Sequence, residues 1–194
     1  MEGIIKFKAN KVNSKIITDN EFAIINPWRQ YCFDRKYIGI DTDGIGYGNI
    51  SFRSRENNEF IISASATGGI SNLLASDYSR VISFDIKNNV LNCEGEKLAS
   101  SESLSHAAIY KAKPEIKAVL HIHNIDLWKK QLNILPTTAM NAEYGTQAMA
   151  DAITDIVKKS NDSGIIIMGG HREGILSYGS NLESCIIAIN NFFL

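Results

Sequence analysis

The chain has 194 residues, of which 44% are hydrophobic and 21% are charged, a composition that supports a folded core and excludes disordered and fibrous proteins. Twenty basic against twenty-one acidic residues give a net charge of −1. A general electrostatic attraction to nucleic acid or anionic lipid is therefore excluded, and an anionic ligand needs a local site.

Apolar runs and cysteine spacing narrow the class of protein further. The longest apolar runs, such as 165–168, are far shorter than the roughly 20 residues that a membrane-spanning helix needs. Residues 1–10 lack the pattern of a signal peptide. Cys32, Cys93 and Cys185 form no C-x-x-C pair, which indicates reduced thiols that pack in the core. We therefore expect a cytoplasmic protein with no membrane partner.

The N-terminal part of the chain predicts a strand and then a helix. Residues 4–7 are strand-like, and a polar stretch leads into a helix expected over 27–36, where Pro27 suits a first turn. Residues 1–20 are expected to be an N-terminal extension of a single domain that covers residues 1–194.

Two hairpins are predicted next. Alternating residues predict strands over 49–53 and 60–63, joined by a polar turn. Strands over 81–86 and 90–93 flank a turn in which asparagine can adopt a positive φ angle. Because hairpins pair their strands antiparallel, the sheet must be at least partly antiparallel.

The second half of the chain alternates helices with strands. Helices are expected over 101–111, 125–131, 146–159 and from a capping box at 180–183 onward, and strands over 118–123, 164–168 and 175–178. The two longer helices carry the apolar stripes of amphipathic helices. Early hairpins and later helix–strand units indicate an α/β fold of three layers with a mixed sheet.

Two histidines at the end of a predicted strand are the first candidate metal ligands. His121 and His123 lie two residues apart, so strand alternation puts both imidazoles on one face of the sheet. Two ring nitrogens on one face can bind a single cation, such as a tetrahedral zinc ion. Alternatively, the two rings face water or accept separate hydrogen bonds.

His171 is the third candidate ligand. It lies in the Gly-Gly-His-Arg-Glu-Gly segment 169–174, directly after an apolar strand, where glycine frees the backbone to present an imidazole. Three protein ligands leave one coordination position open, as in catalytic zinc sites. The alternative is an ordinary loop residue. His106 lies inside a predicted helix and is interpreted as structural.

Two carboxylates are candidates for proton transfer. Glu102 begins a predicted helix, where an acidic residue can also do no more than stabilise the helix end. If the fold brings Glu102 to the cation, its carboxylate can act as a general acid or base. Glu143 could be a second carboxylate of the site, but it is interpreted as an ordinary polar residue before a helix.

Small polar residues gather in three segments that could together bind an anion. The segments are Gly48-Asn49 with Ser51, residues 65–69, and Ser100-Ser101. Backbone amides, hydroxyls and a helix N-terminus bind anions without formal positive charge, so convergence of the three segments predicts an anion pocket. Each segment alone is equally compatible with a simple turn.

Taken in order, these segments resemble the class II aldolase/adducin-head family, which includes fuculose-phosphate aldolase, ribulose-phosphate 4-epimerase and methylthioribulose-phosphate dehydratase. The resemblance runs from about Pro27 to Ser184 and rests on residues 48–53, 65–68, 100–102, 121–123 and 170–171. It implies an αβα sandwich around a central mixed, largely antiparallel sheet. It also implies a homo-oligomer, with a tetramer favoured, whose active sites lie at subunit boundaries.

The resemblance also implies a role for each candidate residue. His121, His123 and His171 would bind Zn²⁺ or another divalent metal such as Mn²⁺ or Co²⁺, and Glu102 would be the catalytic acid/base. A substrate phosphate would be held by the small polar residues Asn49, Thr67, Gly68, Ser100 and Ser101. The implied partner is a small phosphorylated molecule, with no nucleic acid.

Three features depart from the family pattern. Residues 172–174 read Arg-Glu-Gly, where the family has a glycine directly after the third histidine. Only 23 residues follow His171, so the longer tail that gives aldolases and epimerases a catalytic tyrosine or other proton donor is expected to be missing. The segment before Asn49 is longer than usual and would supply an added strand or an interface.

The sequence thus predicts a metal-dependent, aldolase-type lyase that acts on a small phosphorylated ketose or hydroxy-carbonyl compound through a metal-stabilised enediolate. Dehydration and epimerisation of sugar phosphates share this electrophilic step, so the ligand set does not choose among the three reactions. An interaction module that is catalytically silent, like the adducin head, would be expected to have lost the ligand set.

Overall fold

One large mixed sheet organises the protein. The computed structural model describes residues 4–14, 17–53 and 58–192. Its main strands are β1 (Lys8–Val12), β4 (Asn49–Phe52), β5 (Phe60–Ser63), β6 (Tyr78–Asp85), β7 (Val90–Glu94), β8 (Ala118–His123), β9 (Gly164–Ile167) and β10 (Gly174–Gly179). They form an eight-stranded sheet in the order β1-β7-β6-β5-β4-β8-β10-β9, in which β1 and β7 run parallel and the other described pairs are antiparallel. The short strands β2 (Gly39–Ile40) and β3 (Gly46–Tyr47) form a separate pair.

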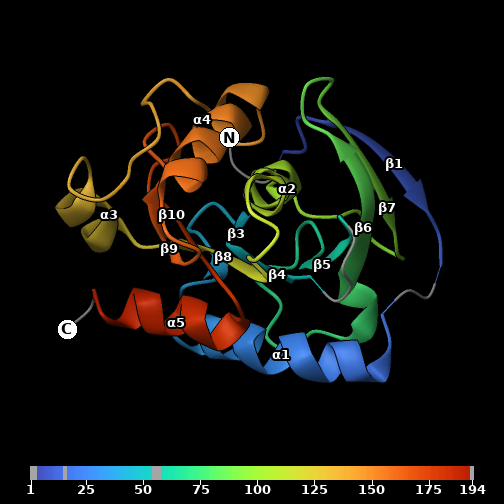
Figure 1. Ribbon diagram of the computed structural model, residues 1–194. Helices are drawn as coiled ribbons and strands as arrows, with labels where there is room; N and C mark the ends of the chain where they lie inside the picture. The colour runs from blue at the N-terminus through green and yellow to red at the C-terminus, as the bar shows by residue number, and fades with distance from the viewer. Residues whose placement is uncertain (1–3, 15–16, 54–57, 193–194) are drawn as a thin grey trace.

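Helices cover both faces of the sheet and make a three-layer structure (Figure 1). On one face lie α1 (Asp19–Asp34) and α5 (Leu182–Asn190), and on the other lie α2 (Ser103–Ala112) and α4 (Gln147–Lys159). The helix α3 (Ile125–Gln131) follows β8, and a 3-10 turn, η1 (Ala75–Asp77), precedes β6. Two hydrophobic clusters, one under each pair of helices, form the core. The predicted α/β fold with a mixed, largely antiparallel sheet is confirmed.

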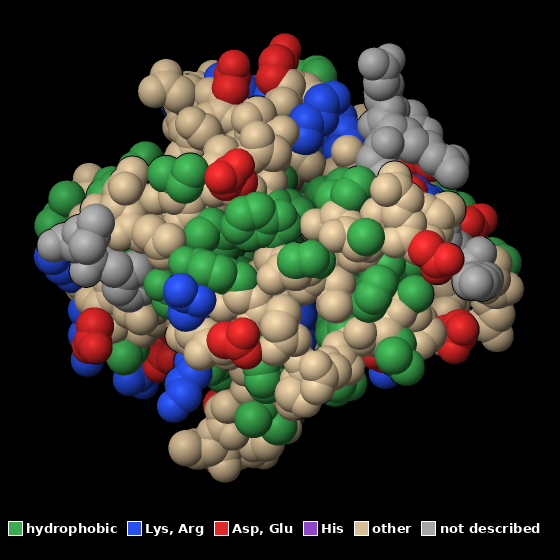
Figure 2. Space-filling view, turned by 90° about the horizontal axis from the view of Figure 1, so that it is seen from below, with side chains coloured by type: hydrophobic (Ala, Val, Ile, Leu, Met, Phe, Trp, Pro, Cys, Tyr) green, Lys and Arg blue, Asp and Glu red, His purple; other side chains and the backbone are tan. Residues whose placement is uncertain are grey.

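The outer face of α1 and α5 carries a band of hydrophobic side chains (Figure 2). Ile24 and Ile187 are exposed there, and a cavity of about 310 Å³ is lined in part by Ile24, Trp28 and Leu182. Hydrophobic side chains on this face are therefore exposed as well as buried in the core. Within the ranges that the structure describes, none of the helices combines the length and the apolarity that crossing a membrane would require.

The N-terminal part differs from the sequence prediction. The first strand is β1 rather than residues 4–7, and it pairs with β7 at the edge of the sheet. The helix starts eight residues earlier than predicted, because Thr18 and Glu21 form a capping box. Pro27 therefore lies inside α1, where its missing N–H removes one helical hydrogen bond, rather than in the first turn.

The later elements form close to their predicted positions. Both hairpins are confirmed, and Asn89 in the second turn has a φ of 55°. Residues 54–57 of the first predicted turn lie outside the described residues. The bounds of β8 and α3 agree with the prediction residue by residue. The three cysteines are buried and free, as expected of thiols that pack in the core.

Two helices differ in detail. The helix α2 is buried on all sides from Ser103 to Tyr110, because it lies between the sheet and α4; the predicted amphipathic stripe is wrong for this helix. The capping box of α5 consists of Asn181 and Ser184 rather than Ser180 and Glu183. The shift by one residue leaves the predicted stripe of Leu182, Cys185, Ile186 and Ile189 buried.

Candidate metal centre

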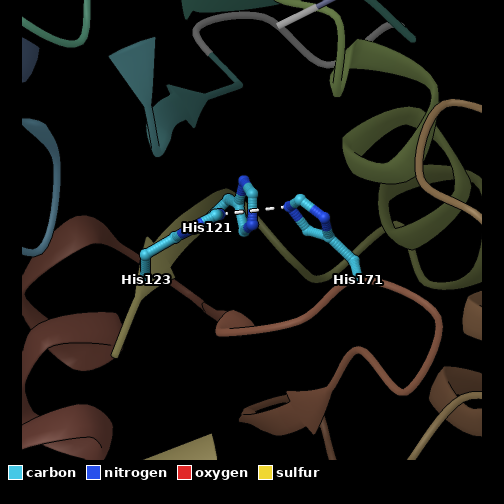
Figure 3. Close-up of side chains that lie close together, drawn as sticks. All are labelled: His121, His123 and His171. Atoms are coloured by element: carbon cyan, nitrogen blue, oxygen red, sulfur yellow. Dashed lines mark hydrogen bonds between the residues drawn. The ribbon is translucent and has the colours of Figure 1, made fainter. Parts of the chain in front are cut away.

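Three histidine side chains meet near the C-terminal end of the inner strand β8. His121 and His123 extend from the same face of β8, as strand alternation predicted, and His171 reaches them from the turn after β9 (Figure 3). One nitrogen of each imidazole lies within 4.8 Å of the other two, and the Nε2 atoms of His123 and His171 are 3.1 Å apart. All three rings are buried. The structure therefore brings together the three residues that the sequence proposed as ligands.

Close backbone packing explains how His171 reaches the other two rings. A side chain at Gly169 would collide with the carbonyl oxygen of Thr138, and one at Gly170 with that of Ala142. The Gly169 amide also donates to the Thr138 hydroxyl at 2.9 Å. The two glycines are thus needed for close approach, whereas the positive φ in this turn, 72°, belongs to Glu173.

The environment keeps two of these imidazoles neutral. Burial, followed by the neighbouring His123 and His171, holds the pKa of His121 well below its usual value. Burial, followed by His123 and Lys6, lowers the pKa of His171 to about 3. A metal ion binds the neutral form of imidazole, because the coordinating nitrogen must offer a lone pair. His121 and His171 are therefore uncharged, which is one requirement for binding a metal ion.

The donor set fits a divalent metal ion. Ligand nitrogens around a tetrahedral zinc ion, with Zn–N distances of about 2.0–2.1 Å, lie about 3.4 Å apart. The 3.1 Å separation between His123 and His171 is close to that value. His121 faces Asn49 with Nδ1, and its buried Nε2 has no hydrogen-bond partner among the described residues. The Nε2 atom is therefore the nitrogen of His121 that is left for a cation.

A buried carboxylate lies beside the three imidazoles. Glu102 is the N-cap residue of α2, and its Oε1 atom is 4.0 Å from Nε2 of His171. The other oxygen, Oε2, accepts a hydrogen bond of 2.9 Å from the Ser105 hydroxyl, one turn further along the helix. Glu102 is only 3% exposed. Glu102 is therefore shielded from water and lies close to the candidate metal site.

The three segments rich in small polar residues converge on one small pocket next to these side chains. The pocket is lined by residues 46–49, 64–68 and 100–102 together with His121. It includes every residue that the sequence proposed for phosphate binding, namely Asn49, Thr67, Gly68, Ser100 and Ser101. The N-terminus of α2 also opens here, and its partial positive charge favours an anion. Ser51 is absent from this lining, because its hydroxyl lies between His106 Nδ1 and the Tyr110 hydroxyl in the core.

A buried arginine binds backbone carbonyls of residues 67–71, which include part of the pocket lining. Arg29 on α1 is 1% exposed, and its guanidinium donates to the backbone carbonyls of Thr67, Gly68 and Ser71 at 2.8–3.2 Å. On the other side, a side chain at Gly68 would come within 2.5 Å of the Gly39 carbonyl oxygen. The loop at Thr67 and Gly68 therefore has Arg29 bound on one side and the backbone of Gly39 packed on the other.

Sequence reasoning missed the aromatic residues that pack on the histidines. The Tyr47 ring is stacked on His123 with centroids 5.0 Å apart, and the Tyr144 ring lies 4.9 Å from that of His171. The Lys6 ammonium lies 4.0 Å above the Tyr144 ring. Tyr47 directly precedes the Gly48-Asn49 segment, which is the one sequence signal that could have pointed to it.

Glu143 lies outside the cluster of histidines. Its carboxylate is exposed and forms an ion pair of 3.0 Å with Lys6. This position agrees with the interpretation of Glu143 as an ordinary polar residue. His106 is buried in the core, as expected of a structural histidine.

Comparison with known proteins identifies a family and several relatives. The sequence model of the family described as "Class II Aldolase and Adducin N-terminal domain" matches residues 40–192. A curated relative from Mycoplasma pneumoniae, named "Probable L-ribulose-5-phosphate 4-epimerase UlaF", is 29% identical over 131 residues, which are 63% of this chain and 52% of the relative. The chain thus spans about half the length of this relative.

Solved structures share the fold. An L-fuculose 1-phosphate aldolase superposes with a TM-score of 0.67 and 21% identity, covering 91% of this chain and 83% of the aldolase. The N-terminal class II aldolase domain of a conserved protein from Thermoplasma acidophilum gives a TM-score of 0.60 and 14% identity, covering 93% of this chain and 94% of that domain. At these identities the likeness concerns the fold.

Proposed function

The chain belongs to the class II aldolase and adducin N-terminal domain family, and on that premise we propose that it is a metal-dependent lyase that cleaves a small phosphorylated ketose or related hydroxy-carbonyl compound. The family match confirms the resemblance that the sequence motifs indicated. One arrangement carries the proposal: three buried imidazoles within 4.8 Å of one another, beside the buried carboxylate of Glu102.

In this proposal the three histidines bind the metal ion and Glu102 transfers the proton. His121, His123 and His171 would hold the ion, for which we propose Zn²⁺, or Mn²⁺ or Co²⁺ in its place. When bound, such an ion polarises adjacent carbonyl and hydroxyl oxygens and stabilises the negative charge that develops on them. The Glu102 carboxylate, oriented by the Ser105 hydroxyl, takes and returns the proton.

The neighbouring pocket supports a phosphorylated substrate. Thr67, Gly68, Ser100, Ser101 and Asn49 surround it with amides and hydroxyls next to the N-terminus of α2. These groups can bind a phosphate without a lysine or arginine in direct contact with it. Because the pocket also includes His121 and Glu102, one small molecule can reach the phosphate pocket and the metal site together.

Epimerisation is the second candidate reaction. It is favoured by the curated relative, whose name describes a ribulose-phosphate 4-epimerase. Cleavage converts one sugar phosphate into two shorter carbonyl compounds, whereas epimerisation retains all carbon atoms in one ketose. Product analysis with L-fuculose 1-phosphate and L-ribulose 5-phosphate as first substrates separates the two reactions, and a dehydratase would instead release water.

Metal analysis and a substrate screen test the proposal together. We expect about one divalent ion per chain in the purified protein and loss of that ion in the His123→Ala variant. Turnover of a sugar phosphate should require the ion and disappear with chelator. Full metal occupancy in His123→Ala would remove His123 from the ligand set. A protein that neither binds metal nor turns over any sugar phosphate would instead be a silent interaction module.

A homo-oligomer, with a tetramer favoured, is part of the same proposal. It rests on the assembly that the resemblance to this family implies. Light scattering coupled to gel filtration should give about four times the mass of one chain. A monomer at micromolar concentration would contradict this part of the proposal and leave the metal chemistry untouched.

A further inference from the structure

Asn49 lies directly against one of the three histidines. The register of β4 and β8 pairs Asn49 with His121, and Nδ2 of the asparagine is 3.3 Å from Nδ1 of the imidazole. The two side chains are 4% and 1% exposed. Asn49 therefore contacts a candidate metal ligand on the side of the ring opposite to the free Nε2.

Two buried atoms of this pair have no hydrogen-bond partner among the residues described. They are Oδ1 of Asn49 and Nε2 of His121. With Nδ2 as donor to Nδ1, the ring proton of the neutral imidazole must be on Nε2. A nitrogen that carries a proton cannot bind a cation, and an unpaired buried polar group destabilises the folded state. This hydrogen-bond arrangement is thus unfavourable for metal binding.

Rotation of the Asn49 amide by 180° reverses the arrangement. The oxygen and nitrogen of an amide are nearly equal in size, so the rotation exchanges donor and acceptor within the same space. Oδ1 then accepts the Nδ1–H of His121, and the proton leaves Nε2 with a lone pair for a cation. Metal-binding histidines commonly donate their second ring N–H to an oxygen, which fixes the tautomer and the ring orientation.

We propose that Asn49 is a positioning residue of the metal centre, whose side-chain oxygen holds His121 in the tautomer that binds the ion. The inference rests on the proposed function, because it presumes a metal ion at the three imidazoles. It assigns Asn49 a second task beside the phosphate contact predicted from the sequence. The rotated amide also replaces the unpaired oxygen by an NH₂ donor in a residue that lines the anion pocket.

Zinc affinity of three variants tests the proposal. Zinc dissociation constants would be measured by competition with a chromophoric chelator, without any substrate. We expect Asn49→Ala to bind zinc about 10–100-fold more weakly than the unaltered protein, which is the usual effect of losing such a partner. Asn49→Asp keeps an acceptor oxygen at the same position and should restore the affinity to within a few-fold.

Ser51→Ala is the matched control. Ser51 lies two residues further along β4 on the same face, and its hydroxyl contacts His106, which is not a candidate ligand. This variant removes an equally buried polar contact and should leave zinc affinity unchanged. Circular dichroism of each metal-free variant checks that it is folded.

The outcomes separate this proposal from the function on which it rests. If the unaltered protein binds no zinc, the proposed function fails. If it binds zinc and Asn49→Ala binds equally well, or Asn49→Asp is as weak as Asn49→Ala, only the role of Asn49 is overturned. Nitrogen-15 NMR of the zinc-loaded, unaltered protein needs no variant: His121 Nδ1 should carry the proton, and a bare Nδ1 would contradict the proposal.

Discussion

Nε2 of His171 lies 4.0 Å from Oε1 of Glu102, although the two residues are 69 positions apart in the sequence. The imidazole comes from the turn after β9, and the carboxylate comes from the N-cap of α2. Both side chains are buried. The contact therefore places the proposed acid/base group at the edge of the proposed metal site, in a region sheltered from water.

The first prediction concerns proton transfer by Glu102. The change Glu102→Gln keeps the size of the side chain and removes its ability to take a proton. We expect kcat for the substrate found in the screen to fall by about 10²–10⁴-fold, the usual contribution of general acid/base catalysis. Zinc content, measured by elemental analysis, should stay near that of the unaltered protein.

Ser105→Ala provides a graded comparison. This change removes the hydroxyl that donates to Oε2 of Glu102 and leaves the carboxylate in place. Its kcat should fall by less than that of Glu102→Gln. A Glu102→Gln variant that retains full turnover would show that another group moves the proton.

The second prediction concerns the loop that forms one wall of the anion pocket. In Gly68→Ala, the new Cβ atom would lie 2.5 Å from the Gly39 carbonyl oxygen and 2.8 Å from the Tyr47 amide nitrogen. Because backbone atoms cannot move aside locally, the loop must shift. Inorganic phosphate should bind the metal-loaded protein at least about tenfold more weakly, equivalent to ~1.4 kcal/mol, as measured by calorimetry.

Gly69→Ala is the control for this prediction. Its new Cβ atom would meet the side chain of Ile40 at 3.0 Å, and that side chain is exposed and can move. Phosphate affinity should change little. Equal losses in both variants would mean that phosphate binding does not depend on the position of Gly68.

The third prediction concerns the buried charge of Arg29. In Arg29→Met, the carbonyls of Thr67 and Gly68 lose their donor. We expect the free energy of unfolding to fall by about 1–3 kcal/mol and the phosphate-induced rise in Tm to shrink. Arg29→Lys should recover part of both effects, because an ammonium can still donate to one carbonyl.

Arg35→Ala serves as the control for Arg29, because it removes the same charge at the end of the same helix. Arg35 is exposed and lies over the Tyr31 ring with its guanidinium 3.6 Å from the centroid. Thermal unfolding with and without phosphate would compare the variants. If Arg35→Ala reduces the phosphate effect as much as Arg29→Met, general charge rather than loop geometry is responsible.

Local patterns predicted the parts of the site that lie on regular elements. Strand alternation at residues 118–123 placed His121 and His123 on one face, and the structure confirms it. His171 is 48 residues from His123, so no local period could relate the two rings. His171 was a candidate because it follows an apolar strand next to two glycines, and the family resemblance then implied that it binds the same ion as His121 and His123.

Contacts with backbone atoms could not be predicted. In the sequence Arg29 looks like any arginine on an exposed helix face. It binds backbone carbonyls, which every residue type carries, so the residue types of its partners do not reveal the contact. The packing of Tyr144 on His171 likewise depends on how two loops approach each other. The predicted start at Pro27 was wrong because the capping box of Thr18 and Glu21 is the stronger signal for a helix start.

The last prediction concerns the pH dependence of stability and the buried His106. Burial lowers the pKa of this imidazole to about 3, against about 6.5 in the unfolded chain. Well above pH 6.5 neither state binds the proton, so stability does not depend on this group. Below pH 6.5 the unfolded state binds more protons, and the free energy of unfolding falls by about 1.4 kcal/mol per pH unit until the pH approaches the pKa of the folded state.

His106→Gln isolates this contribution, because glutamine does not titrate and can still hydrogen-bond to Ser51, the partner of His106 Nδ1. Urea unfolding of both metal-free proteins should give a stability difference that is constant between pH 7.5 and 7.0. Between pH 6.0 and 5.0 that difference should change by about 1.4 kcal/mol against the unaltered protein. The other histidines titrate in both proteins and cancel in the comparison. A difference that does not vary with pH would mean that His106 is protonated equally in the folded and unfolded states.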